Sequence, residues 1–98
     1  MVIEWLRFRV PVAQQGAFLS ADAATWTAVL AAQPGFAGKQ TWIAAAAPDV
    51  VNLIIRWDDR AVWQAVPADI LSAAEAGFQV AFGGAAAFID CTDLDVVG

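Results

Sequence analysis

The chain has 98 residues, with ten acidic and five basic side chains and a formal net charge of −5. This length predicts one domain spanning residues 1–98. The basic residues are few and scattered, which argues against nucleic acid and against an anionic membrane surface as partners. No apolar run approaches the roughly 20 residues that are needed to span a bilayer.

The cysteine and histidine content limits the disulfides, metal sites and catalytic groups that the chain can form. Cys91 is the single cysteine, so an internal disulfide is excluded and a reducing cytoplasm is the expected location. Charged residues occur within the first ten positions, so we expect no signal peptide. The chain lacks histidine, metal-ligand spacing and a phosphate-binding glycine loop. We therefore expect neither a metal nor another cofactor.

The first half of the chain alternates between strand and helix patterns. Residues 2–10 alternate imperfectly, with large apolar side chains on both faces, which predicts a strand covered on both sides. From about residue 14 to Pro34-Gly35, apolar residues recur at helical spacing. Residues 39–45 predict a second strand, and Pro48-Asp49 predicts the turn of a hairpin.

The stretch 50–63, VVNLIIRWDDRAVW, is the one around which the fold is organised. Its β-branched first half predicts a buried central strand that ends at Trp57. Asp58 or Asp59 then offers the N-cap of a short helix. A long second helix is expected over 67–82, and its inner stripe includes Phe78.

A last strand over 87–94 completes the order β-α-β-β-α-β. This is an α+β, ferredoxin-like arrangement, in which two helices cover one face of a four-stranded antiparallel sheet. The other face also carries apolar groups, and five tryptophans and six phenylalanines exceed what a small core can easily hide. A homodimer with the two sheets packed together is the expected solution.

The candidate site is a pocket between sheet and helices. Trp57 is expected to face it from the strand end, and the small Ala74 is expected to leave it open. The predicted ligand-binding residues are Trp57, Leu6, Phe8, Leu53, Ile55, Ile70, Ala74 and Phe78. Such a pocket suits a planar hydrophobic ligand. The alternative is that Trp57 only packs at the strand-to-helix corner; Trp63 is expected to be core, and Glu75 to be solvated.

No catalytic residue can be named from the sequence. Arg7, Arg9 and Arg56 are the only candidates for binding an anion, but ion pairs with Glu4 or with the aspartates near the C-terminus are the expected role, because the planar fork of Arg matches a carboxylate. Cys91 has no histidine to activate it as a nucleophile and is expected to be inert.

Two short stretches carry a resemblance to a known family. Gln33-Pro34-Gly35-Phe36 is similar to the family's Pro-Gly-Phe turn. Trp57-Asp58-Asp59-Arg60-Ala61-Val62-Trp63 is similar to its strand-end Trp, acidic cap and aromatic residue one turn later. Over essentially its whole length the chain resembles the antibiotic-biosynthesis-monooxygenase-like (ABM-like) family of the dimeric α/β-barrel superfamily, and within it a small cyanobacterial branch.

The resemblance implies a dimeric α/β barrel with a pocket between sheet and helices. The family includes cofactor-free oxygenases acting on polycyclic aromatics, and haem-degrading enzymes. The haem branch relies on an Asn in strand one, a Trp after strand three and a His that binds iron. This chain matches only the Trp, as Trp57. The implied function is therefore a cofactor-free, monooxygenase-like protein that binds a planar hydrophobic metabolite. The alternative is a non-catalytic ligand-binding or assembly module using the same dimer.

Overall fold

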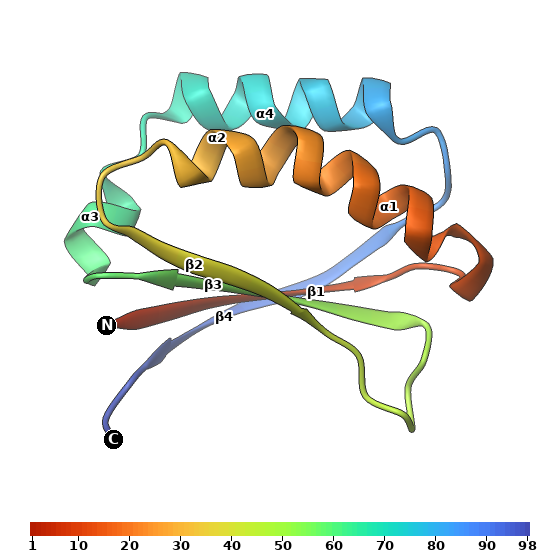
Figure 1. Cartoon of the computed structure of the whole chain (residues 1–98), viewed down its shortest axis with the longest axis horizontal. Coiled ribbons are helices and arrows are strands. Elements are labelled where there is room, and N and C mark those ends of the chain that lie inside the picture. Colours follow the sequence, from red (N-terminus) through yellow and green to blue (C-terminus); the bar gives the residue numbers. More distant parts are fainter.

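The computed structural model describes residues 1–98, and its long helical regions lie over one face of a four-stranded antiparallel sheet, with the short α3 at the end of the sheet (Figure 1). The strands are β1 (Val2–Arg9), β2 (Phe36–Trp42), β3 (Val50–Trp57) and β4 (Ala87–Asp95). The helical segments are η1 (Val12–Gln14), α1 (Gln15–Asp22), η2 (Ala23–Thr27), α2 (Ala28–Ala31), α3 (Arg60–Gln64) and α4 (Ala68–Ala81). The predicted α+β, ferredoxin-like order is confirmed. No helix has both the length and the apolar character needed to cross a bilayer.

Strands β1 and β3 form the centre of the sheet, whose order is β2-β3-β1-β4. Their antiparallel register sets Leu6 opposite Leu53 and Glu4 opposite Ile55. Because side chains alternate along a strand, all four of these face the helices. β3 is the most buried strand, as its β-branched sequence predicted.

The first helical region is less regular than its apolar spacing indicated. It starts with a 3-10 turn, and the five residues of η2 form a π-helical segment between α1 and α2. Within it, the Thr25 hydroxyl donates a hydrogen bond to the carbonyl oxygen of Ala21 (2.7 Å), a contact that competes with regular helical bonding. The extra residue of a π turn rotates the side chains that follow, and such segments are frequent at functional sites.

Two element boundaries differ from expectation. The second strand runs from Phe36 to Trp42. It starts earlier than expected because Phe36 already pairs with Trp57, before a shift of register between Phe36 and Gly38. The long helix begins at Ala68, and Pro67 stays extended as its N-cap. Of the two predicted caps for α3, Asp59 fills the role: its carboxylate accepts a hydrogen bond from the Val62 amide (2.9 Å).

The space between sheet and helices is filled at its two ends by separate apolar clusters. One contains Val10, Phe18, Ala21, Val51, Leu53, Phe78 and Phe82, and the other contains Val2, Leu30, Ile55 and Trp57. Leu6 and Trp26 contact both. The region between the clusters is therefore bounded by apolar side chains without being one continuous core.

Gly35 occupies a position where a larger residue would be strained. It has φ +81°, and a Cβ built on it would lie 2.6 Å from Cβ of Val62. Because both backbone strain and overlap would result, Gly35→Ala should lower the free energy of unfolding by about 2 kcal/mol or more. Urea denaturation measures the loss.

Gly16→Ala is the matched control. Gly16 lies within α1, has no positive φ, and a Cβ there would meet nothing within 4 Å. This change should raise stability by about 0.5–1 kcal/mol. Equal stability of the two variants would contradict the proposed strain at Gly35.

Candidate functional site

A cavity of about 420 Å³ lies between the sheet and the helices. Residues of all four strands line it from the sheet, and residues of α1, η2, α2, α3 and α4 line it from the helices. Five of the eight predicted ligand-binding residues line it: Leu6, Phe8, Leu53, Ile55 and Phe78. The sequence identified the strand residues because alternate residues of a strand share one face, and it identified Phe78 from the helical spacing of apolar residues. Their role as ligand contacts remains a prediction.

The other three predicted residues, Trp57, Ile70 and Ala74, do not line the cavity, so the expectation that Trp57 faces it is wrong. The Trp57 ring is 0 % exposed and packs edge to face on Phe36, with ring centroids 5.8 Å apart. Trp57 shares the inner face of β3 with Ile55, as parity predicted, but its ring fills the core at one end. Ala74 is itself buried in the core, so its small size leaves no opening above Trp57.

Several aromatic residues that were not predicted do line the cavity. Trp26 and Trp63 contribute to its walls, and Phe88, which is 59 % exposed, also borders it. The Trp26 indole Nε1 donates a hydrogen bond to Glu75 Oε2 (3.1 Å), which joins η2 to α4 across the roof. Trp63 was expected to be core and Glu75 to be merely solvated. The π turn that presents Trp26 has no signature in the sequence that could have indicated this arrangement.

A buried ion pair forms one polar part of the lining. The Lys39 ammonium donates hydrogen bonds to Asp22 Oδ2 (2.5 Å) and to the Thr27 hydroxyl (2.8 Å). Both charged side chains are only 7 % exposed. Because each charge has its partner, this pair adds no net charge to the cavity.

Glu4 is the carboxylate of the cavity floor. In the sheet register it and Lys39 flank Ile55 from the two neighbouring strands. Glu4 Oε1 accepts a hydrogen bond from the Trp57 indole (3.1 Å), and no ion pair compensates its charge. Burial raises the pKa of Glu4, while the Trp57 hydrogen bond and the charge of Lys39 oppose this rise.

The arginines do not serve this cavity. Arg7 forms a two-pronged ion pair with Asp90 (2.8 and 2.6 Å), and this interaction lowers the pKa of Asp90. Arg9 pairs with Asp49 instead of a C-terminal aspartate. Neither pairs with Glu4, because they lie on the opposite face of β1. The alternative of ion pairing is therefore correct for Arg7, whose partner Asp90 is one of the aspartates near the C-terminus.

Cys91 does not become a nucleophile. Burial and the nearby charges of Glu4, Asp93 and Asp90 all raise the pKa of its thiol, so the reactive thiolate is disfavoured. No group of His, Cys, Asp and Glu side chains is arranged to hold a metal ion.

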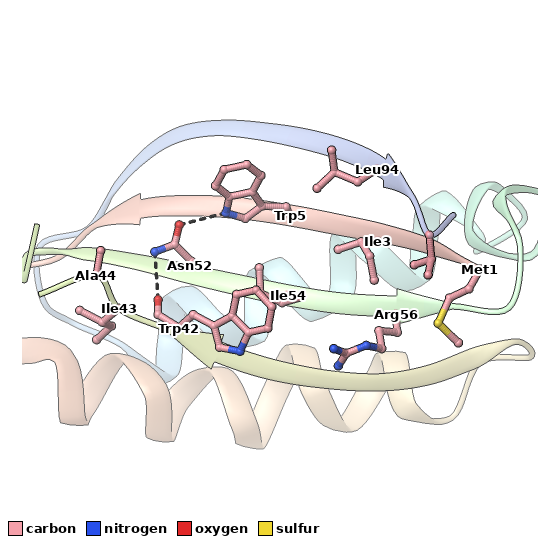
Figure 2. Close-up of a pocket in the computed structure, with 11 residues that line it drawn as sticks. Met1, Ile3, Trp5, Trp42, Ile43, Ala44, Asn52, Ile54, Arg56 and Leu94 are labelled. Atoms are coloured by element: carbon pink, nitrogen blue, oxygen red, sulfur yellow. Dashed lines mark hydrogen bonds between the residues drawn. The ribbon is translucent and has the colours of Figure 1, made fainter. Parts of the chain in front are cut away.

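The opposite face of the sheet carries a shallow groove of about 610 Å³ (Figure 2). Its lining is mostly apolar and includes Ile3, Trp5, Trp42, Ile43, Ile54 and Leu94. The Trp5 indole donates to Asn52 Oδ1, and the Asn52 amide donates to the Trp42 carbonyl oxygen, each at 2.9 Å. Arg56 also borders this groove, on the face opposite Trp57 as parity predicted.

Comparison with known proteins finds similar solved structures. The sequence matches no protein-family model and no curated protein. The fold resembles SnoaB, a cofactor-independent oxygenase from Streptomyces nogalater, with a TM-score of 0.70, 18% identity, and coverage of 99% of this chain and 93% of that one. It also resembles a candidate antibiotic biosynthesis monooxygenase from Bordetella bronchiseptica, with a TM-score of 0.70, 15% identity, and coverage of 98% and 96%.

A third solved structure agrees with these two. It is a candidate antibiotic biosynthesis monooxygenase from Caulobacter crescentus, with a TM-score of 0.67, 19% identity, and coverage of 99% and 91%. The resemblance to ABM-like proteins expected from the sequence is thus confirmed at the level of the fold.

The placement of Trp57 gives the second prediction. Because its ring is fully buried outside the cavity lining, Trp57→Ala should lower the free energy of unfolding by about 3–5 kcal/mol. Trp63→Ala should cost less, since Trp63 is half-buried and borders open space. Chemical denaturation of both variants gives the order, and a larger loss for Trp63→Ala would show that the rings are wrongly placed.

Proposed function

We propose that this chain is a cofactor-free, monooxygenase-like protein that binds a planar hydrophobic metabolite in the cavity between sheet and helices. The observation that carries this proposal is the cavity itself, whose volume of about 420 Å³ falls in the range typical of small-molecule sites. Its lining is mainly apolar with a few polar groups, which is the pattern such sites share.

Aromatic side chains support a flat ligand. Rings from the sheet and from the helices border the cavity, including Phe8, Trp26, Trp63 and Phe88. Aromatic pairs favour offset-stacked or edge-to-face arrangements, so these walls suit a molecule with extended rings. The Trp26–Glu75 hydrogen bond holds part of the roof in place.

The oxygenase part of the proposal is supported by fold likeness. SnoaB, described as a cofactor-independent oxygenase, shares this fold at 18% identity. In a cofactor-free reaction of this kind, the ligand itself would supply the electrons that reduce oxygen, and the cavity would position the ligand.

A non-catalytic binding module is the second candidate. The chain has neither histidine nor tyrosine, and its one thiol has a raised pKa, so it offers few groups for general acid–base or nucleophilic work. The two candidates differ in a simple readout. Only an oxygenase consumes dissolved oxygen in proportion to the ligand that is added.

We further propose that the chain forms a homodimer through the open face of its sheet. Trp42 and Leu94 are 51% and 45% exposed there, and the groove of Figure 2 runs between them. A contiguous apolar face of this kind is unfavourable in water, and stable permanent dimers bury on the order of 2,000 Å² or more.

Filling the cavity tests ligand binding. Leu71→Trp adds a large ring to the lining from α4, so it should weaken binding of anthraquinone by about tenfold or more. Quenching of tryptophan fluorescence measures the affinity. Val80→Trp is the matched control, because Val80 lies on the same helix and is 89% exposed. Failure of the unaltered protein to bind any planar aromatic probe would remove the proposed function.

A charge in the sheet groove tests the dimer. The unaltered protein should sediment as a species of twice 10.3 kDa at micromolar concentration. Ile43→Glu should shift it toward the monomer, raising the dissociation constant by about tenfold or more, because a carboxylate would be desolvated at the interface. Val80→Glu, on the outer side of α4, should leave the dimer intact. A stable, soluble monomer of the unaltered protein would exclude this assembly.

A further inference from the structure

The charge of the cavity lining is the feature that the proposed function leaves unexplained. Among the lining residues the charged side chains are Glu4, Asp22, Lys39 and Glu75. Asp22 and Lys39 neutralise each other in their buried pair. Glu4 and Glu75 form no ion pair, so the cavity carries two uncompensated carboxylates and no uncompensated cation.

The two carboxylates lie on different walls. Glu4 is on the floor, in the centre of the sheet, and Glu75 is on α4 in the roof. Glu75 accepts hydrogen bonds from Trp26 (3.1 Å) and from Gln79 (2.8 Å) near solvent. Glu4 accepts one hydrogen bond through Oε1, from Trp57, and no protein group donates to its Oε2. The second oxygen of Glu4 is therefore free to accept a hydrogen bond from a ligand.

Aromatic faces surround this negative floor. Phe8, Phe18, Trp26, Trp63, Phe78 and Phe88 all line the same cavity. The face of an aromatic ring attracts a cation, and this attraction grows when the cation is withdrawn from water. Carboxylate and aromatic faces together make a site that favours positive charge on an otherwise hydrophobic molecule.

We propose that the cavity selects planar hydrophobic molecules that carry an amine, and that the Glu4 carboxylate binds the ammonium group. This inference rests on the proposed function, since it requires the ligand to occupy this cavity. An ammonium and a hydroxyl can both donate a charge-assisted hydrogen bond to a carboxylate, but only the ammonium adds the Coulomb attraction of an opposite charge, so the amine should outweigh a hydroxyl in the same position. An anionic ligand would meet two carboxylates and be disfavoured.

The electrostatic environment of Glu4 also favours a cationic ligand. Burial raises the pKa of its carboxyl, because the charged form is poorly solvated in the cavity floor. Lys39 opposes the rise from across Ile55, but its ammonium is already bound to Asp22 and Thr27. A ligand cation beside Glu4 would supply the missing compensation.

Three naphthalene probes of equal size test the selection. They are 2-naphthylmethylamine, which is cationic near neutral pH, the neutral 2-naphthylmethanol, and the anionic 2-naphthoate. Fluorescence quenching and calorimetry should rank the affinities as amine, alcohol and carboxylate, with the amine bound about tenfold more tightly than the alcohol. Glu4→Gln keeps the acceptor for Trp57 but removes the charge, and should reduce the amine-to-alcohol ratio to near unity.

Two further variants complete the design. Glu75→Gln should reduce the same ratio by a smaller factor, because Glu75 is exposed to water. Asp69→Asn removes a carboxylate from the first turn of α4 that does not line the cavity, and should leave the ratio unchanged.

The outcomes separate this inference from the proposed function. If the alcohol binds but the amine binds no more tightly, the cation selection is wrong while the hydrophobic site stands. If the amine preference survives both Glu4→Gln and Glu75→Gln, the carboxylates are not its source and the inference fails. If no probe binds, both proposals are overturned.

Discussion

The antiparallel pairing of β1 with β3 is the constraint on which the rest of the structure depends. Its register sets Leu6 against Leu53 and Glu4 against Ile55. A shift by one residue would turn every one of these side chains to the other face of the sheet. The apolar floor, the carboxylate within it and the exposed tryptophan groove on the reverse side are therefore three consequences of one alignment.

The helices add the second constraint, because they must cover that floor without filling it. The two apolar clusters anchor the roof at its ends, with Phe18 and Phe78 in one and Leu30 in the other. Between them, the π-helical segment η2 presents Trp26 to the space and to Glu75 on α4. Packing is thus strong where the layers meet at their ends and open between them, which leaves the cavity.

Buried charge shows how the fold tolerates polarity in this region. Asp22 and Lys39 are brought together from α1 and β2, and each satisfies the other with help from Thr27. Glu4 has only the Trp57 indole and the more distant Lys39. An uncompensated carboxylate is an unusual component of an apolar floor, because burial of charge is costly unless a partner is present. This imbalance is the physical basis for expecting a ligand with complementary charge.

The sequence alone determined the element order, the central position of residues 50–57 and the face on which each strand residue lies. These follow from periodicity and β-branching, which are local properties of the chain. It also identified the sheet residues of the cavity, Leu6, Phe8, Leu53 and Ile55, because strand parity is read directly from position. Only the tertiary structure decided which large rings fill the core and which border open space. Trp57 and Trp63 are the same residue type and lie six positions apart, yet the first is enclosed by packing at the sheet end and the second borders the cavity. That difference arises from packing between residues distant in sequence, such as the contact of the Trp57 ring with Phe36, which leaves no periodic signal in the chain.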